Sequence, residues 1–159
     1  MQILVALKVK TKQGSFFMHE LDHKLYAISR NKLDKAIIKE TPLLKQAVKH
    51  LNDYLEGRLF EFDLPFILEG SKFQKDIYHA LLKVRYGQTI SYKELAAKAG
   101  YPNAYRAVGS VMANNKLPFI IPCHRVIKND GSLGNYGFGV KLKRYLINLE
   151  ASYGSNSRN

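Results

Sequence analysis

The sequence predicts an α/β protein of the α+β kind, with two domains along the chain. Its 159 residues suffice for two small domains, and a hydrophobic content of 46% can supply their cores. β-rich runs separated by turn signals fill the first 30 residues, whereas helix caps followed by apolar stripes dominate after residue 40. We therefore expect a small N-terminal antiparallel sheet with a helix, and then a mostly helical C-terminal domain that contains a helix-turn-helix.

The N-terminal domain is predicted to span residues 1–68. Its strands are expected at residues 3–10, 15–19 and 24–29, because these β-rich runs are separated by turn signals such as residues 11–14. A helix should begin at Thr41, with Pro42 in its first position, and end at Gly57. Residues 60–62 resemble a further short strand, and residues 64–70, which contain a proline and a glycine, mark the link between the domains.

The C-terminal domain is predicted to span residues 69–151. Ser71 with Gln74, and Ser91 with Glu94, have the spacing of capping boxes that begin two helices. Residues 92–99 and 104–114 then form two short helices around a tight turn, which describes a helix-turn-helix. A glycine-rich loop at residues 129–139 precedes a last helix at residues 140–151. Residues 152–159 are small and polar, so we expect a disordered tail there.

Charge and composition favour a nucleic-acid partner. Twenty-five Lys and Arg against 13 Asp and Glu give a net charge of +12, which favours DNA through counterion release, although solubility alone is the alternative. Neither a transmembrane run nor a secretory leader is present in the sequence, which predicts a cytoplasmic protein that does not bind membranes. One cysteine excludes an internal disulfide framework, and no Cys or His cluster has zinc-ligand spacing, so no metal or cofactor is expected.

The only cysteine, Cys123, lies at the end of an apolar run and is followed by His124 and Arg125. A neighbouring imidazolium or positive field lowers the pKa of a thiol and makes it nucleophilic. Adjacent side chains do not face one another on a helical turn, so a bridging water would have to join Cys123 to His124. The alternative is an inert, buried cysteine that only fills space.

The motif Pro-Cys-His-Arg-Val at residues 122–126 resembles the active-site signature of the O6-alkylguanine-DNA alkyltransferases, the methylated-DNA–protein-cysteine methyltransferases. The resemblance continues through residues 90–92, 106–109, Asn115 and residues 134–136 to Glu150, in the family's order and near its spacing. It implies direct DNA repair, in which Cys123 irreversibly accepts the alkyl group of O6-alkylguanine, with O4-alkylthymine as a further candidate lesion. Each molecule would act once, because a thioether has no good route back to a thiol.

The resemblance also implies roles for individual residues. His124 would act as the base, Glu150 would fix its tautomer, and Tyr92 would favour base extrusion and share a proton with guanine N3. The full catalytic set is Cys123, His124, Glu150, Tyr92 and Asn115, of which Asn115 would tie the active-site turn to the DNA-binding helix. The implied substrate pocket consists of Met112, Pro118, Val126, Asn135, Tyr136 and Gly137, and Arg125 would be structural.

The helix at residues 104–114 has many small residues, which permit close approach to a partner. Tight packing against another helix is one interpretation, and DNA binding is the other. The resemblance implies a monomer that binds the minor groove of double-stranded DNA, with Arg106 filling the space left by the flipped base. The DNA-binding set is Arg106, Tyr92, Ala107, Gly109, Ser110 and Ala113. Two other classes remain open: a lesion sensor of the same fold, which would lack the cysteine, and a cysteine hydrolase on a DNA-binding domain.

Overall fold

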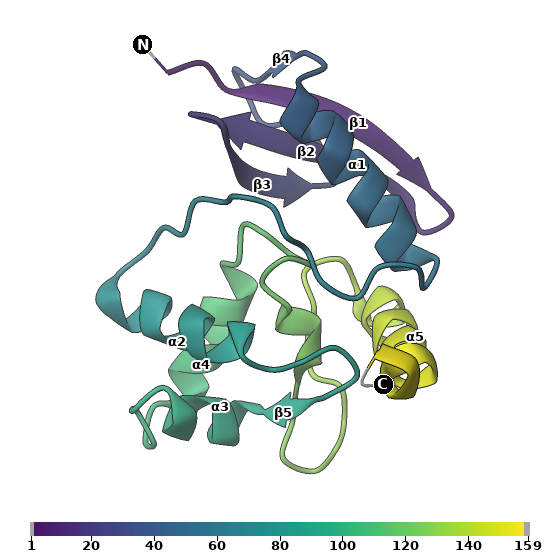
Figure 1. Ribbon diagram of the computed structural model, residues 1–159. Coiled ribbons are helices and arrows are strands. Elements are labelled where there is room, and N and C mark those ends of the chain that lie inside the picture. The colour runs from purple at the N-terminus through teal and green to yellow at the C-terminus, as the bar shows by residue number, and fades with distance from the viewer. Residues whose placement is uncertain (1, 158–159) are drawn as a thin grey trace. The chain divides into compact units, whose positions relative to one another are not determined.

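The computed structural model describes residues 2–157, and the chain divides into two compact units (Figure 1). The N-terminal unit ends at Leu68 and the C-terminal unit begins at Glu69. Each unit is described by itself below. None of the helices in the described range is long and apolar enough to cross a membrane.

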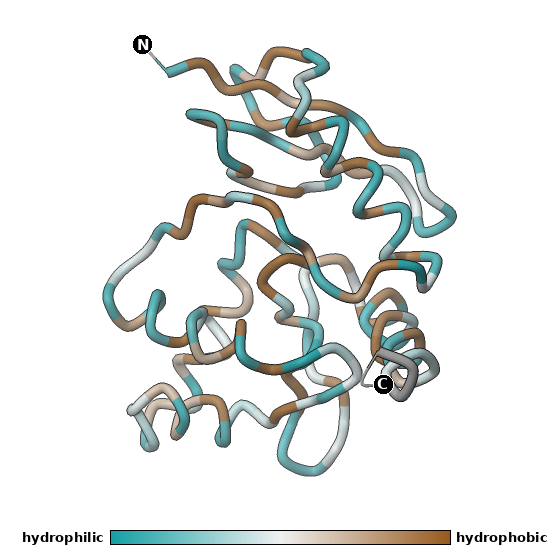
Figure 2. Tube along the Cα trace, viewed as in Figure 1, coloured by the Kyte–Doolittle hydropathy of each residue, from teal (hydrophilic) through white to brown (hydrophobic). Residues whose placement is uncertain are grey.

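The N-terminal unit is built on a four-stranded sheet with the strand order β3-β2-β1-β4. Strands β1 (Val5–Thr11), β2 (Gly14–Leu21) and β3 (Lys24–Ser29) are antiparallel, and each contributes buried hydrophobic residues to the core (Figure 2). The two-residue strand β4 (Ile37–Ile38) pairs in parallel with β1. The predicted antiparallel arrangement is therefore confirmed for β1, β2 and β3, and the short strand β4, which was not predicted, makes the sheet mixed at one edge.

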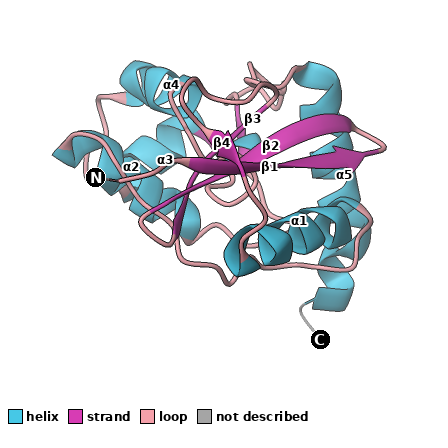
Figure 3. Ribbon diagram, turned by 90° about the horizontal axis from the view of Figure 1, so that it is seen from above, coloured by secondary structure: helices cyan, strands magenta, loops and turns pink. Residues whose placement is uncertain are grey.

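Helix α1 (Pro42–Leu55) packs against β1 and β2 (Figure 3). It begins as predicted, because the Thr41 hydroxyl accepts a hydrogen bond from the Leu44 N–H at 3.0 Å. Residues 60–62 do not form a strand. Instead, Leu25 N–H donates to the Pro65 carbonyl at 2.9 Å, and the Ile67 N–H donates to the Leu25 carbonyl at 2.8 Å, so the segment that meets β3 lies a few residues later.

The C-terminal unit is mostly helical. Its elements are α2 (Lys72–Leu82), β5 (Ile90–Ser91), α3 (Tyr92–Lys98), α4 (Tyr105–Ala113), a 3-10 turn at Cys123–Arg125, β6 (Val126–Ile127) and α5 (Val140–Ser157). Ser71 and Gln74 form the predicted capping box, and Ser91 accepts from the Glu94 N–H at 3.0 Å. Helices α3 and α4 pack against each other around the turn at residues 99–104, as in a helix-turn-helix.

Helix α5 differs from its prediction at the C-terminal end. It continues to Ser157, whereas the sequence predicted an end at residue 151 and a disordered tail from residue 152. The reason lies in two glycines, since a Cβ built on Gly154 would stand 3.2 Å from the Cα of Gly87. This backbone contact holds the last turns of α5 against the turn after α2. Residues 158 and 159 lie outside the described residues.

The buried core of the C-terminal unit positions the turn that carries Cys123. Leu81, Leu95, Val108 and Leu146 are fully buried, and they come from α2, α3, α4 and α5. The apolar run at residues 117–121 is buried as well, although Phe119 has a φ of 74°, a left-handed conformation that costs free energy in a non-glycine residue. The buried run therefore holds in place the residues that lead into the turn.

Candidate active site

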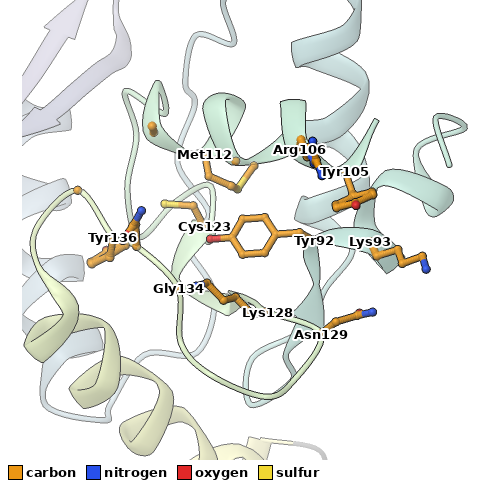
Figure 4. Close-up of a pocket in the computed structure, with 14 residues that line it drawn as sticks. Tyr92, Lys93, Tyr105, Arg106, Met112, Cys123, Lys128, Asn129, Gly134 and Tyr136 are labelled. Atoms are coloured by element: carbon orange, nitrogen blue, oxygen red, sulfur yellow. The ribbon is translucent and has the colours of Figure 1, made fainter. Parts of the chain in front are cut away.

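A cavity of about 700 Å³ opens in the C-terminal unit, and Cys123 is part of its wall. In Figure 4 the Cys123 side chain lies between those of Tyr92 and Tyr136, and Met112 lies beside them. The predicted site residues that line this cavity are Tyr92, Arg106, Gly109, Met112, Ala113, Cys123, Asn135, Tyr136 and Gly137. They come from α3, α4, the 3-10 turn and the glycine-rich loop, so the fold brings together segments that lie far apart in the sequence.

The backbone around Cys123 holds the thiol in place. The Cys123 N–H donates to the Ile121 carbonyl at 2.7 Å, and the Cys123 carbonyl accepts from the Val126 N–H. Only 7% of the residue is exposed. Burial raises the pKa of the Cys123 thiol, while a hydrogen bond from Asn115 and the charge of Lys143 act in the opposite direction. Before the reaction Cys123 is therefore a protonated thiol, and a base has to remove its proton to form the thiolate.

Asn115 joins the end of α4 to the segment that leads into the turn. Its side-chain amide donates to the Ile121 carbonyl at 2.8 Å, and its carbonyl oxygen accepts from the Leu117 N–H at 3.0 Å. These bonds connect the helix to the residues that precede Cys123. Asn115 does not line the cavity, so its contribution in the described structure is to orient the turn and to contact the thiol.

His124 is fully buried and bonded to Glu150. The distance from His124 Nε2 to Glu150 Oε2 is 2.6 Å, and Glu150 is 1% exposed. Burial alone would raise the pKa of Glu150, but hydrogen bonds and charges from His124 and Arg125 bring it down to about 2. An ionised carboxylate only accepts, so Nε2 carries the proton and Nδ1 keeps its lone pair.

Burial lowers the pKa of His124, and Glu150 only partly offsets this effect. His124 is therefore neutral near pH 7, as a general base must be. Arg125 holds Glu150 from the other side, since its Nε and Nη2 donate to the two carboxylate oxygens at 2.8 and 3.1 Å. Arg125 Nη1 also donates to the Val84 carbonyl at 2.7 Å. The guanidinium thus stabilises the ionised form of Glu150, and its hydrogen bonds connect α5 to the segment after α2.

Lys143 is a residue of the site that the sequence interpretation missed. It is fully buried on α5, and its ammonium donates to the Val126 carbonyl at 2.7 Å and to the Asn135 carbonyl at 3.1 Å. Burial lowers the pKa of Lys143 to about 8, although the interaction with Cys123 acts to raise it. The signal was its position three residues before Leu146 and seven before Glu150, which places it on the inward face of the helix.

The small residues of α4 face outward. Arg106, Ala107, Ser110 and Ala113 are exposed, whereas Val108 and Val111 are buried. A Cβ built on Gly109 would meet nothing within 4 Å, so this glycine is not required for packing inside the described chain. Of the two interpretations of this helix, the exposure favours a surface that meets a partner.

Other predicted pocket residues have different positions. Pro118 and Val126 are buried and are not among the described residues that line the cavity. Gly137 lies at the wall, where an added Cβ would meet nothing within 4 Å. The next residue, Phe138, stacks on Phe119 with ring centroids 5.7 Å apart, and it does not line the cavity.

Besides Gly134, four lining residues were not predicted as site residues: Lys93, Tyr105, Lys128 and Asn129. All four are exposed, and their neighbours along the chain include residues that were predicted. Lys128 and Asn129 directly follow β6, and exposed polar residues after a strand carry no distinctive sequence signal. Among the described residues, no group of three His, Cys, Asp or Glu side chains could hold a metal ion.

A helix-turn-helix lies beside a cavity whose wall includes the Cys123 thiol, and a buried imidazole–carboxylate pair lies next to that thiol in the chain. This combination is typical of a DNA-binding protein with a reactive cysteine. A family model described as "6-O-methylguanine DNA methyltransferase, DNA binding domain" matches residues 72–152. This match covers half of the chain, and the chain belongs to the 6-O-methylguanine DNA methyltransferase family.

Individual relatives agree with this assignment. A methylated-DNA–protein-cysteine methyltransferase of Methanosarcina barkeri is 43% identical over 113 residues, which cover 71% of this chain and 72% of the relative. The protein of that name from Mycobacterium tuberculosis is 47% identical over 106 residues, which cover 67% of this chain and 64% of the relative. The crystal structure of Mycobacterium tuberculosis OGT in complex with DNA is similar with a TM-score of 0.86 and 35% identity, over 92% of each chain.

Proposed function

We propose that the protein repairs O6-alkylguanine in double-stranded DNA by transferring the alkyl group irreversibly to Cys123. The observation that carries this proposal is that Cys123 lines one cavity with Tyr92 of α3 and Arg106 of α4, while His124 and Glu150 stand behind it. The names of the relatives support the same reaction. We also place the protein in the cytoplasm and expect it to act as a monomer.

The lesion has to leave the duplex before it can react. Cys123 is buried apart from the cavity wall, so an alkyl carbon inside stacked DNA cannot reach its sulfur. Extrusion of a base costs a few kcal/mol, and less when the base pairs poorly. Arg106 is exposed at the edge of the cavity, where its side chain can fill the vacated position in the stack.

The minor groove suits the exposed face of α4. That groove is only about 6 Å wide, so a helix can approach it closely only when its facing side chains are small. The exposed residues Ala107, Ser110 and Ala113, together with Gly109, meet this requirement. Arg106 would then be the large, charged side chain of α4 that enters the duplex.

In the transfer step, the Cys123 sulfur attacks the alkyl carbon, and the bond between that carbon and O6 breaks. The thiol proton passes through a bridging water to Nδ1 of neutral His124, whose Nε2 proton remains bonded to Glu150. The leaving guanine gains negative charge, and the Tyr92 hydroxyl shares a proton with its N3. The guanine anion then takes up a proton at N1 from water and His124 releases its extra proton to water, so the products are a thioether on Cys123, a neutral His124 and a normal guanine.

Backbone carbonyls would hold the base in position. The carbonyls of Cys123 and Val126 already accept from the Val126 N–H and from Lys143, respectively, and each oxygen has a second lone pair for the guanine N2 amino group. Met112 and Tyr136 contribute apolar surface to the cavity wall. Pro118 would act from outside the cavity, by supporting the turn.

The deciding experiment is the intact mass of the protein after incubation with duplex DNA that contains O6-methylguanine. One methyl group per molecule, located on Cys123 by peptide mapping, is the expected result, and the protein should then be inert. Cys123→Ala should bind the duplex but accept no methyl group. Repeated turnover by one molecule would contradict the proposal and would instead indicate a hydrolase.

A further inference from the structure

Two lysines reach the cavity mouth from the same end of the two-stranded sheet. Strands β5 and β6 pair in parallel, with Ser91 opposite Ile127 as their last pair. The chain continues from these strands into Tyr92 and Lys93 on one side and into Lys128 on the other. Because parallel strands lie about 4.8 Å apart, their carboxyl ends bring both continuations to one edge. Lys93 and Lys128 both line the cavity that contains Cys123.

Their positions relative to Tyr92 define the mouth. In Figure 4, Lys93 lies on the far side of the Tyr92 ring from Cys123. Lys128 lies next to Gly134 and near the hydroxyl end of Tyr92, since a Cβ built on Gly134 would stand 3.0 Å from the Tyr92 hydroxyl and 3.6 Å from Lys128 Cγ. The two lysines therefore reach one opening from two different segments, Lys93 from the start of α3 and Lys128 from the residues after β6.

Both ammonium groups are available for an external anion. Lys93 and Lys128 are exposed, and in the described part of the chain no ion pair or side-chain hydrogen bond occupies either Nζ. By contrast, Lys49, Lys72 and Lys116 each bind a carboxylate. Each free ammonium is a mobile point charge on a four-carbon stem, which suits contact with a phosphate.

We propose that Lys93 and Lys128 form a clamp on the DNA backbone, in which they bind the phosphates on the two sides of the extruded nucleotide. The inference rests on the proposed function, since it requires a base inside the cavity. When that base lies against Cys123, its sugar and its two flanking phosphates must lie at the mouth, where these side chains are. The clamp holds the nucleotide in the extruded state without reading its sequence.

The test measures binding in a Cys123→Ala background, so that no transfer disturbs the equilibrium. Affinity for a duplex with one O6-methylguanine is compared between the parent protein, Lys93→Gln and Lys128→Gln across a fourfold range of salt. The rise in salt weakens binding of the parent protein by a certain factor. Each lost phosphate contact should make that factor about 3.5 times smaller over the fourfold range. Lys93→Arg and Lys128→Arg should restore it, because they keep the charge.

A matched control and a modified DNA locate the contact. Lys75→Gln removes another exposed charge, on α2 and outside the cavity, and should leave the salt dependence unchanged. A neutral methylphosphonate at a phosphate beside the lesion should weaken the parent protein as much as the lysine substitution does, and the two changes together should cause no further loss.

Two results would overturn the clamp. In one, the lysine substitution and the methylphosphonate weaken binding independently, so that their losses of affinity add. In the other, Lys93→Gln and Lys128→Gln leave the salt dependence unchanged, as Lys75→Gln should. Absence of methyl transfer in the mass experiment would overturn the proposed function instead. The binding measurement does not depend on transfer, so the two failures are distinguishable.

Discussion

Replacing Glu150 with Gln tests both the stability and the chemistry of the site. Glu150 accepts from His124, from two nitrogens of Arg125, and from the Gly87 N–H at 3.2 Å. Its pKa of about 2, against an ordinary value of 4.5, corresponds to about 3 kcal/mol of stability at pH 7. Removing one partner of a buried ion pair costs roughly 3–5 kcal/mol, which agrees. Glu150→Gln should therefore unfold at a clearly lower urea concentration.

The pH dependence distinguishes this origin from a simple packing defect. Because the folded pKa of Glu150 is lowered, its contribution is complete above about pH 4.5 and disappears as the pH falls toward 2. The difference in unfolding free energy between Glu150→Gln and the unmodified protein should shrink over that range. Glu61→Gln is the matched control, because it removes an exposed carboxylate and should change stability by less than about 0.5 kcal/mol.

The same substitution should slow alkyl transfer while leaving DNA affinity nearly unchanged. A general base contributes roughly 10²–10⁴-fold, and without Glu150 the His124 tautomer is no longer fixed, so we expect single-turnover rates to fall about 10- to 100-fold. The affinity should persist because the groove-facing side of α4 is not altered. Rates and binding are measured separately under conditions in which the variant is folded. Equal losses in both would show that Glu150 serves the fold alone, and an unchanged rate would refute its role in the chemistry.

Three other substitutions probe different parts of the site. Arg106→Ala should slow repair of duplex DNA by about one to two orders of magnitude but slow the reaction with free O6-benzylguanine much less in single-turnover assays, since only the duplex needs a base held out of the stack; equal slowing of both reactions would argue against Arg106 filling the place of the extruded base. Gly137→Arg should slow transfer from O6-benzylguanine more than from O6-methylguanine in DNA, because Gly137 lines the cavity and Phe138 stacks elsewhere; equal effects would mean that loop conformation matters instead of size. Lys143→Met should lower the unfolding free energy in urea by about 3 kcal/mol, because the buried Val126 carbonyl and the partly buried Asn135 carbonyl lose a charged donor; an unchanged midpoint would show that these bonds are not important.

The sequence predicted best the features that depend on nearby residues. Thr41, Ser71 and Ser91 were identified as helix caps, and all three accept the expected backbone hydrogen bond, because capping joins residues only three positions apart. Strand β4 was missed since its two residues form a strand only through pairing with β1. The end of α5 was missed for the same reason, because the close approach of Gly154 to Gly87 is a long-range contact.

The site shows the same division between local and long-range information. The order of Cys123, His124 and Arg125 indicated a reactive thiol, but it did not show which groups surround them. The cavity depends on a parallel pairing between β5 and β6, and Lys143 reaches the site only because α5 packs its inward face there. Exposed Lys93 and Lys128 resemble ordinary surface lysines until the fold places them at one opening.

The arrangement around Glu150 explains why a buried arginine stands beside a histidine and a cysteine. If His124 were the only partner, Glu150 could lose its charge by taking the histidine proton, since burial disfavours both charged forms. Arg125 prevents this, because its guanidinium keeps its charge and donates two hydrogen bonds to the carboxylate. Glu150 therefore stays ionised, and His124 keeps its proton on Nε2. Its other nitrogen remains able to accept the proton of Cys123 at the moment when the proposed transfer requires a thiolate.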